Sequence, residues 1–240
     1  MKTLQSITAL VFLLSTTLSC AQWNGQKIKG NGDITTVKRS TESYDGLKAA
    51  GPMDFKLVEG KEGNITIKGD ANLMEYIITE VKDNKLVVRV KKGVSLKYTQ
   101  AIVVTVPYES ISSVSLAGSG DIESSGIIKA DQFNVSLAGS GDINLAVSSE
   151  SLDSAIAGSG DIKLKGSTKN LTTKIAGSGD FDGNDLQSTD VTAKLTGSGD
   201  IDVVCNGKLV VRITGSGDVN YSGKPTSKDT KVTGSGSVGN

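Results

Sequence analysis

Residues 154–162 read Ser-Ala-Ile-Ala-Gly-Ser-Gly-Asp-Ile, and close variants of this stretch recur through the second half of the chain. Gly-Ser-Gly-Asp occupies residues 118–121, 139–142, 158–161, 177–180, 197–200 and 215–218, and Gly-Ser-Gly-Ser occupies 234–237. Successive copies start 18 to 21 residues apart. A nearly fixed period of this length indicates one structural unit that is stacked repeatedly, so the repeat predicts the architecture.

Apolar residues flank each tetrapeptide with period-two spacing. An aliphatic residue stands two positions before each first glycine, and another apolar residue follows each Asp or final Ser. The first set is Leu116, Leu137, Ile156, Ile175, Leu195, Ile213 and Val232, and the second is Ile122, Ile143, Ile162, Phe181, Ile201, Val219 and Val238. This alternation is typical of a strand, a turn and a second strand that share one apolar face.

One unit is too short to bury its own apolar row, whereas stacked units bury row over row. The sequence therefore predicts an all-β fold, a β-helix-like solenoid with coils of about 19 to 20 residues. A propeller blade needs about 40–50 residues, and an antiparallel meander gives no reason for an identical turn in every unit. In the solenoid, the glycines permit a sharp corner and each Asp accepts hydrogen bonds from nearby backbone N–H groups.

Composition excludes several classes of function. The 240-residue chain has 26 Lys and Arg against 26 Asp and Glu, no histidine, and 4% aromatic residues. The balanced charge gives no electrostatic case for nucleic acid, and the missing histidine excludes a Ser-His-Asp or Cys-His hydrolase within this chain. Gly-Ser-Gly-Asp matches neither the dinucleotide-binding nor the Walker pattern. We therefore predict no catalytic residue and no cofactor.

The first 21 residues are predicted to be an export signal, because Lys2 precedes an apolar stretch and small residues that end in Cys20-Ala21. Two processing outcomes stay open, lipidation of Cys20 or ordinary cleavage before Gln22. We expect an exported protein of the bacterial periplasm, outer membrane or cell surface, with membrane contact only through a lipid anchor. Either outcome leaves Cys205 as a lone thiol, packed like a small apolar residue.

The rest of the chain divides into a tether and one domain. Residues 22–40 are predicted to be a polar tether with an early echo of the repeat at 30–34, and residues 41–237 a single β-solenoid domain. Within it, we expect irregular opening coils over 41–117, which protect one end of the stack, and repeat coils over 118–237. The other end has no comparable cap, so we hypothesise a homo-oligomer through that uncapped C-terminal edge.

The Gly-Ser-Gly-Asp-Ile units, preceded by Val-x-Leu-Ala, are accompanied by Tyr44-Asp45-Gly46-Leu47 and Gly51-Pro52-Met53-Asp54-Phe55. In these motifs the chain resembles a secreted bacterial family, the putative auto-transporter adhesin, head GIN domain family, over about residues 40–237. The resemblance implies a right-handed β-helix-like fold and a surface or envelope location. It implies no particular binding residues.

Three functions remain open on the sequence: a non-enzymatic adhesion or binding module with a protein or glycan ligand at the cell surface, a polysaccharide-acting β-helix enzyme, or a structural spacer of the envelope. A calcium-binding row is a further hypothesis for Asp121, Asp142, Asp161, Asp180, Asp200 and Asp218. Turn capping explains the same six residues, so we predict no metal site. We expect function on the variable polar surface or in residues 41–117.

Overall fold

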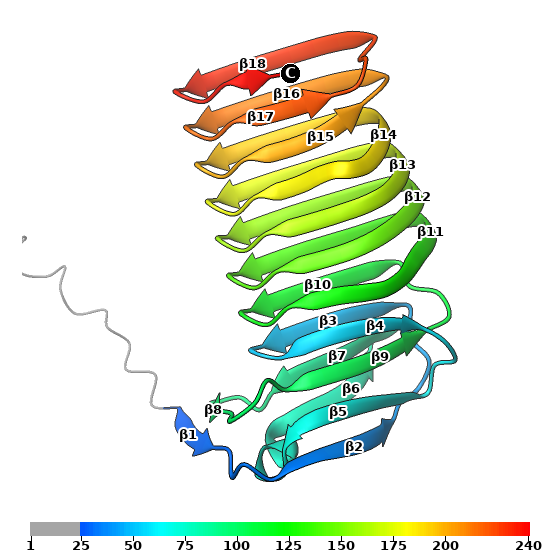
Figure 1. The fold of residues 1–240 in the computed structure, drawn as a ribbon, viewed down its shortest axis with the longest axis vertical. Coiled ribbons are helices and arrows are strands. Elements are labelled where there is room, and N and C mark those ends of the chain that lie inside the picture. The colour runs from blue at the N-terminus through cyan, green and yellow to red at the C-terminus, as the bar shows by residue number, and fades with distance from the viewer. Residues whose placement is uncertain (1–24) are drawn as a thin grey trace, which may run out of the picture.

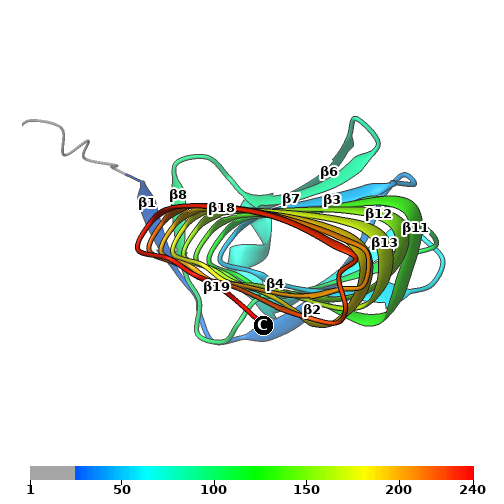
Figure 2. The same cartoon turned by 90° about the horizontal axis from the view of Figure 1, so that it is seen from above.

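The structure is a computed structural model that describes residues 25–240. Figure 1 shows a stack of flattened β-coils, and Figure 2 shows that the coils lie over one another when seen along the stack. The repeat half of the chain forms ten strands: β10 (Ser113–Gly118), β11 (Ile122–Gly139), β12 (Ile143–Gly158), β13 (Ile162–Gly177), β14 (Phe181–Gly197), β15 (Ile201–Cys205), β16 (Lys208–Gly215), β17 (Val219–Ser222), β18 (Ser227–Gly234) and β19 (Val238–Gly239).

These ten strands pair in parallel, each with the equivalent strand of the next coil. The tetrapeptides are in register, so Gly139 lies beside Gly158 and Gly158 beside Gly177. Strands β11 to β14 each run from one Gly-Ser-Gly-Asp corner around a far bend to the next corner. The predicted β-solenoid is therefore confirmed, while the hand of the coil stays an expectation.

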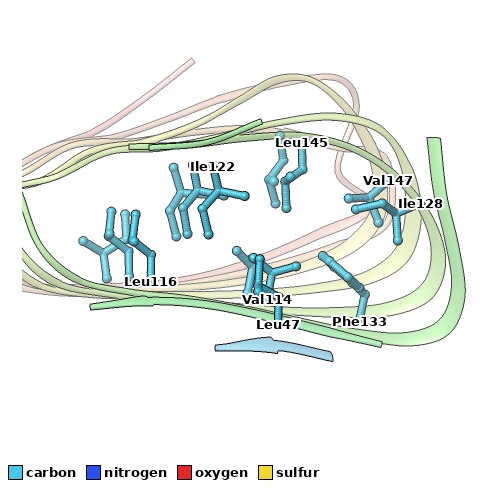
Figure 3. Packing of buried hydrophobic residues seen from close by; sticks show 14 of the residues in the cluster. Leu47, Val114, Leu116, Ile122, Ile128, Phe133, Leu145 and Val147 are labelled. Atoms are coloured by element: carbon cyan, nitrogen blue, oxygen red, sulfur yellow. The ribbon is translucent and has the colours of Figure 1, made fainter. Parts of the chain in front are cut away.

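The core is a set of apolar columns that run along the stack between the two broad walls of the coil. Figure 3 shows Leu116, Ile122, Phe133 and Leu145 pointing into this space from opposite walls. One column continues from Phe133 through four further coils and stays at most 2% exposed throughout, in Leu152, Leu171, Val191 and Leu209. Burial of these rows holds the coils together, because each coil alone would leave its row in water.

The opening half contains nine strands and one short 3-10 helix. The strands are β1 (Gln26–Lys29), β2 (Ile34–Ser40), β3 (Gly46–Gly51), β4 (Asp54–Glu59), β5 (Asn64–Asp70), β6 (Ile77–Lys82), β7 (Lys85–Val90), β8 (Val94–Lys97) and β9 (Val103–Tyr108), and the helix η1 spans Ala71–Tyr76. The apolar stretches of sequence at 55–58, 65–67, 86–90 and 102–106 coincide with β4, β5, β7 and β9, to within three residues at each end.

The coils of the opening half do not stack in sequence order. Strand β3 lies between β7 and β10, and β4 lies between β9 and β11. The chain therefore places β7 and β9 on one side of β3 and β4 before it starts the repeat on their other side. Antiparallel strands then end the stack: β6 pairs with β7, β5 with β9, and β2 with β5. These pairings supply partners for strand edges that would otherwise be open at this end.

The predicted tether at 22–40 is wrong for the described residues. Strand β1 pairs with β8, and β2 pairs over its whole length with β5, where Val37 packs against the core. The echo of the repeat at 30–34 is not a corner of the stack either. Its Gly32 N–H donates a 2.7 Å hydrogen bond to the carboxylate of Asp70. Long-range pairing thus orders a segment that looks polar and irregular on its own.

Asp70 is a fully buried carboxylate whose role the sequence did not indicate. The backbone N–H and the hydroxyl of Thr99 donate hydrogen bonds of 2.9 and 2.7 Å to it, in addition to the bond from Gly32. The two bonds from Thr99 hold the pKa of Asp70 below its usual value, because they favour the ionised form. The carboxylate therefore ties the link between β1 and β2 to the loop before β9.

The last coil replaces apolar core residues by polar ones. Lys228 of β18 stands in register with Leu209, and Thr230 stands in register with Val211. The Lys228 ammonium donates a 2.8 Å hydrogen bond to the Tyr221 hydroxyl and lies 5.3 Å from that ring's centre. An inward-pointing charge on a terminal strand disfavours pairing with another strand. The homo-oligomer through this edge stays a prediction.

Candidate functional site

The Gly-Ser-Gly-Asp corners form a continuous hydrogen-bonded column, which we call the Asp column. In every repeat coil the backbone N–H of the corner Asp donates to the Oδ1 of the equivalent Asp one coil earlier. The donor–acceptor distances range from 2.7 to 3.0 Å for Asp142, Asp161, Asp180, Asp200, Asp218 and the final Ser237. The carboxylates therefore cap the corners, as the turn interpretation predicted.

The Asp column begins one coil earlier than the repeats in the sequence. Asp54 accepts the N–H of Asp121 at 3.3 Å, and Gly51 lies in register with Gly118. The segment Gly51-Pro-Met-Asp54-Phe55 thus makes the first corner of the column. This corner could have been recognised in the sequence, because Gly51 and Asp54 have the same spacing as Gly118 and Asp121.

Within residues 25–240, no three or more His, Cys, Asp or Glu side chains are placed together to hold a metal ion. Calcium binding by the Asp column stays a hypothesis with a direct test. Thermal unfolding in calcium and in chelator should give different midpoints if the column binds the ion. Equal midpoints would contradict it.

We expect Asp161→Ala to lower the free energy of unfolding by about 1 kcal/mol, because the N–H of Asp180 loses its acceptor. Asp161→Asn keeps an acceptor oxygen and removes one charge from a row of like charges, so its stability should equal or slightly exceed that of the unchanged protein. Urea denaturation of both variants measures the difference. Equal losses in the two variants would show that charge, and not the hydrogen bond, matters at this position.

A polar groove of about 830 Å³ crosses the far bend of the coils. It runs over five consecutive coils, from β11 to the turn that follows β15, and we call it the bend groove. The lining residues are Lys129, Ala130, Asp131, Ser148, Ser149, Glu150, Ser167, Thr168, Lys169, Gln187, Ser188, Thr189 and Asn206. This set contains no aromatic residue and is rich in hydroxyl and amide groups.

The bend groove has a regular floor because its residues come from equivalent positions of stacked coils. Ser149, Thr168 and Ser188 lie in register and form a column of hydroxyls, of which Thr168 and Ser188 are buried beneath the surface. The Ser149 hydroxyl donates to Thr168 at 3.1 Å, and Thr168 donates to a backbone oxygen at 3.3 Å. A second column, Lys129, Ser148, Ser167 and Gln187, stands more exposed beside it.

Two of the four charged residues that line the bend groove pair with each other. Lys169 lies 2.6 Å from Glu150, in an exposed ion pair. Asp131 and Glu150 are the only carboxylates that line the groove. Since Glu150 is held by a lysine, the groove does not present the two free carboxylates that glycoside hydrolysis needs. The groups that line it are mainly hydrogen-bond donors and acceptors.

The thiol of Cys205, beside Asn206 of the bend groove, is not a reactive group. Cys205 is fully buried in β15, and its thiol lies 3.4 Å from the carbonyl oxygen of Thr189. Burial raises the pKa of the Cys205 thiol and keeps it protonated. Cys205 thus packs like a small apolar residue, as expected. The predicted export signal, 1–21, and the lipidation candidate Cys20 lie outside the described residues.

None of the helical segments in residues 25–240 has the length and apolar character needed to cross a bilayer. Comparison with protein families gives one match: the family described as "Putative auto-transporter adhesin, head GIN domain" matches residues 43–225. No curated protein matches this sequence.

Solved structures share the fold. A putative adhesin from Bacteroides fragilis superposes with a TM-score of 0.81 at 22% identity, covering 89% of this chain and 99% of its own. A putative lipid binding protein from Parabacteroides distasonis gives 0.70 at 24% identity, with 89% and 99% covered. A putative adhesin from Parabacteroides merdae gives 0.66 at 23% identity, with 89% and 98% covered. At these identities the likeness establishes the fold alone.

Proposed function

The chain belongs to the family described as "Putative auto-transporter adhesin, head GIN domain", and from this premise we propose that it is a non-enzymatic adhesion module exported to the envelope or surface of a bacterium. Its ligand is an extended protein or glycan that lies in the bend groove. The observation that carries the proposal is the groove itself, a polar channel over five coils with a repeating floor.

The bend groove suits an extended ligand for a physical reason. Equivalent side chains recur about every 4.8 Å along a parallel stack, so a chain that lies along the groove meets the more exposed column of Lys129, Ser148, Ser167 and Gln187 at regular intervals. Hydroxyls both donate and accept, which suits sugar hydroxyls and peptide groups alike. The floor is rigid because its strands pair in register on both sides.

The test is binding of the purified protein to an immobilised panel of polysaccharides and extracellular-matrix proteins. Ser167→Trp places a large ring in the bend groove, because Ser167 is exposed in the middle of its floor. We expect at least a tenfold loss of affinity for the captured ligand. Lys165→Trp, two residues earlier on the same strand and outside the groove, is the matched control and should bind normally.

Unchanged binding by Ser167→Trp would remove the bend groove as the site. Turnover of a panel polysaccharide would favour the β-helix enzyme, and absence of any ligand together with a co-purifying envelope protein would favour the spacer. Export and lipid attachment are tested separately, by mass spectrometry of the mature N-terminus. Acylated Cys20 or a free Gln22 are the two outcomes that the sequence predicts.

A further inference from the structure

Four cationic side chains stack in register on one broad wall of the solenoid, away from the bend groove. Lys174 of β13 lies beside Lys194 of β14, Lys194 beside Arg212 of β16, and Arg212 beside Lys231 of β18. Neighbouring strands of a sheet lie about 4.8 Å apart. The three lysines are exposed and Arg212 is half-buried. We call this set the basic ladder.

The basic ladder is short of counter-ions. Arg212 pairs with Asp229 at 2.5 Å, whereas Lys174, Lys194 and Lys231 form no salt bridge with any described residue. Elsewhere on the surface a cation in one coil meets an acid in the next. Lys163 lies 2.6 Å from Asp182, and Lys169 lies 2.6 Å from Glu150.

Like charges at this spacing repel by about 1 kcal/mol per pair even in water. The Asp column carries a comparable repulsion, but each of its carboxylates accepts a backbone N–H and so closes a corner. No equivalent hydrogen bond involves the ammonium groups of the basic ladder within residues 25–240. Lys174, Lys194 and Lys231 therefore form no bond that holds the coil, unlike Arg212, and an external anion would relieve their repulsion.

On the side that faces the Gly-Ser-Gly corners, the wall beside the basic ladder is smooth and uncharged. The adjacent outward column consists of Ala138, Ala157, Ala176, Thr196, Thr214 and Thr233. A shallow depression of about 510 Å³ lies over this wall and ends against Lys174, Lys194 and Thr196. Small side chains let a thin polymer approach the sheet, and the threonine hydroxyls can bond to it beside the charges.

We propose that the basic ladder binds a linear anionic polysaccharide, which lies along the stack with its carboxylate or sulfate groups on the ammonium groups. Its hydroxyls bond to Thr196, Thr214 and Thr233. Single-stranded nucleic acid fits less well, because its binding sites stack bases on aromatic rings and the residues lining the depression include none. A second copy of this chain is the alternative occupant that the binding experiment distinguishes.

The test measures the affinity of the purified protein for dextran sulfate and for polygalacturonate by calorimetry at several salt concentrations, with neutral dextran as the uncharged control. We expect the double variant Lys174→Gln, Lys194→Gln to bind at least tenfold more weakly. The slope of log affinity against log salt should fall by about one per lysine removed. The variant Lys38→Gln, Lys165→Gln removes the same charge from exposed sites off the ladder and should bind normally.

Equal losses in the two double variants would show attraction by net charge alone and would overturn the proposal. Equal affinity for neutral dextran, single-stranded DNA or anionic vesicles would overturn it as well. Salt-dependent self-association that requires the ladder, without binding of either polysaccharide, would identify a second copy as the occupant. Ser167→Trp should leave dextran sulfate binding unchanged, which separates this site from the bend groove.

Discussion

Replacing Gly179 by alanine should unfold the stack or lower its free energy of unfolding by about 4 kcal/mol or more. A Cβ at this position would lie 2.1 Å from the carbonyl oxygen of Gly160 in the coil before. The obstacle is backbone that is hydrogen-bonded in register, so relief requires two coils to separate. Overpacking of this kind reaches the rare upper range of single-substitution effects, because nothing flexible can move aside.

Gly60→Ala is the matched control for this substitution. Its added Cβ would meet only the Pro107 Cβ at 3.9 Å, an ordinary contact. We expect a change within about 0.5 kcal/mol. Urea denaturation followed by circular dichroism measures both variants. A stable Gly179→Ala protein with an unchanged midpoint would mean that the corners do not stack as closely as the structure has them.

Leu171→Lys should cost about 4 kcal/mol at neutral pH, the second large effect. Leu171 is 2% exposed in the column that links Leu152 to Val191. A buried ammonium loses its hydration without a partner, so burial lowers the pKa of the new lysine. The unfolded state then binds more protons than the folded state, and the variant should gain stability as pH rises toward 10.

Leu171→Met keeps an apolar side chain of similar volume and should cost less than about 1.5 kcal/mol with no pH dependence. Lys228 supplies the natural contrast, because it is a lysine in the same column at the exposed last coil. Lys228→Leu should change stability by less than about 1 kcal/mol, since that side chain is already solvated. Similar costs for Leu171→Lys and Leu171→Met would show that the interior admits water.

The fold of the repeat half could be predicted because it depends on patterns of residues that lie within about one repeat of each other. Period-two apolar positions around Ile156 and Ile175 indicate a strand on each side of a turn, and the constant spacing of the tetrapeptides indicates the stack. The same spacing explained the Asp residues as corner caps. The bend groove could not be read in advance, since Ser149, Thr168 and Ser188 acquire meaning only when register places them in one column.

The basic ladder is a second feature that the sequence alone did not predict, in this case because of how charges are distributed. Lys174, Lys194 and Arg212 stand 18 to 20 residues apart in a chain whose formal net charge is zero. Overall composition therefore indicated no charged surface. Parallel pairing brings the three cations onto neighbouring strands and leaves two of them without a salt bridge among the described residues.

The sequence by itself determined the coil, its corners and its interior, because each depends on residues within about one period. Tertiary structure alone decided that β3 lies between β7 and the repeats, that β4 lies between β9 and the repeats, and that Asp54 starts the Asp column. It also decided that residues 26–40 form strands and not a tether. These outcomes depend on partners up to 68 residues away, and local patterns do not specify which distant strand edge a segment will pair with.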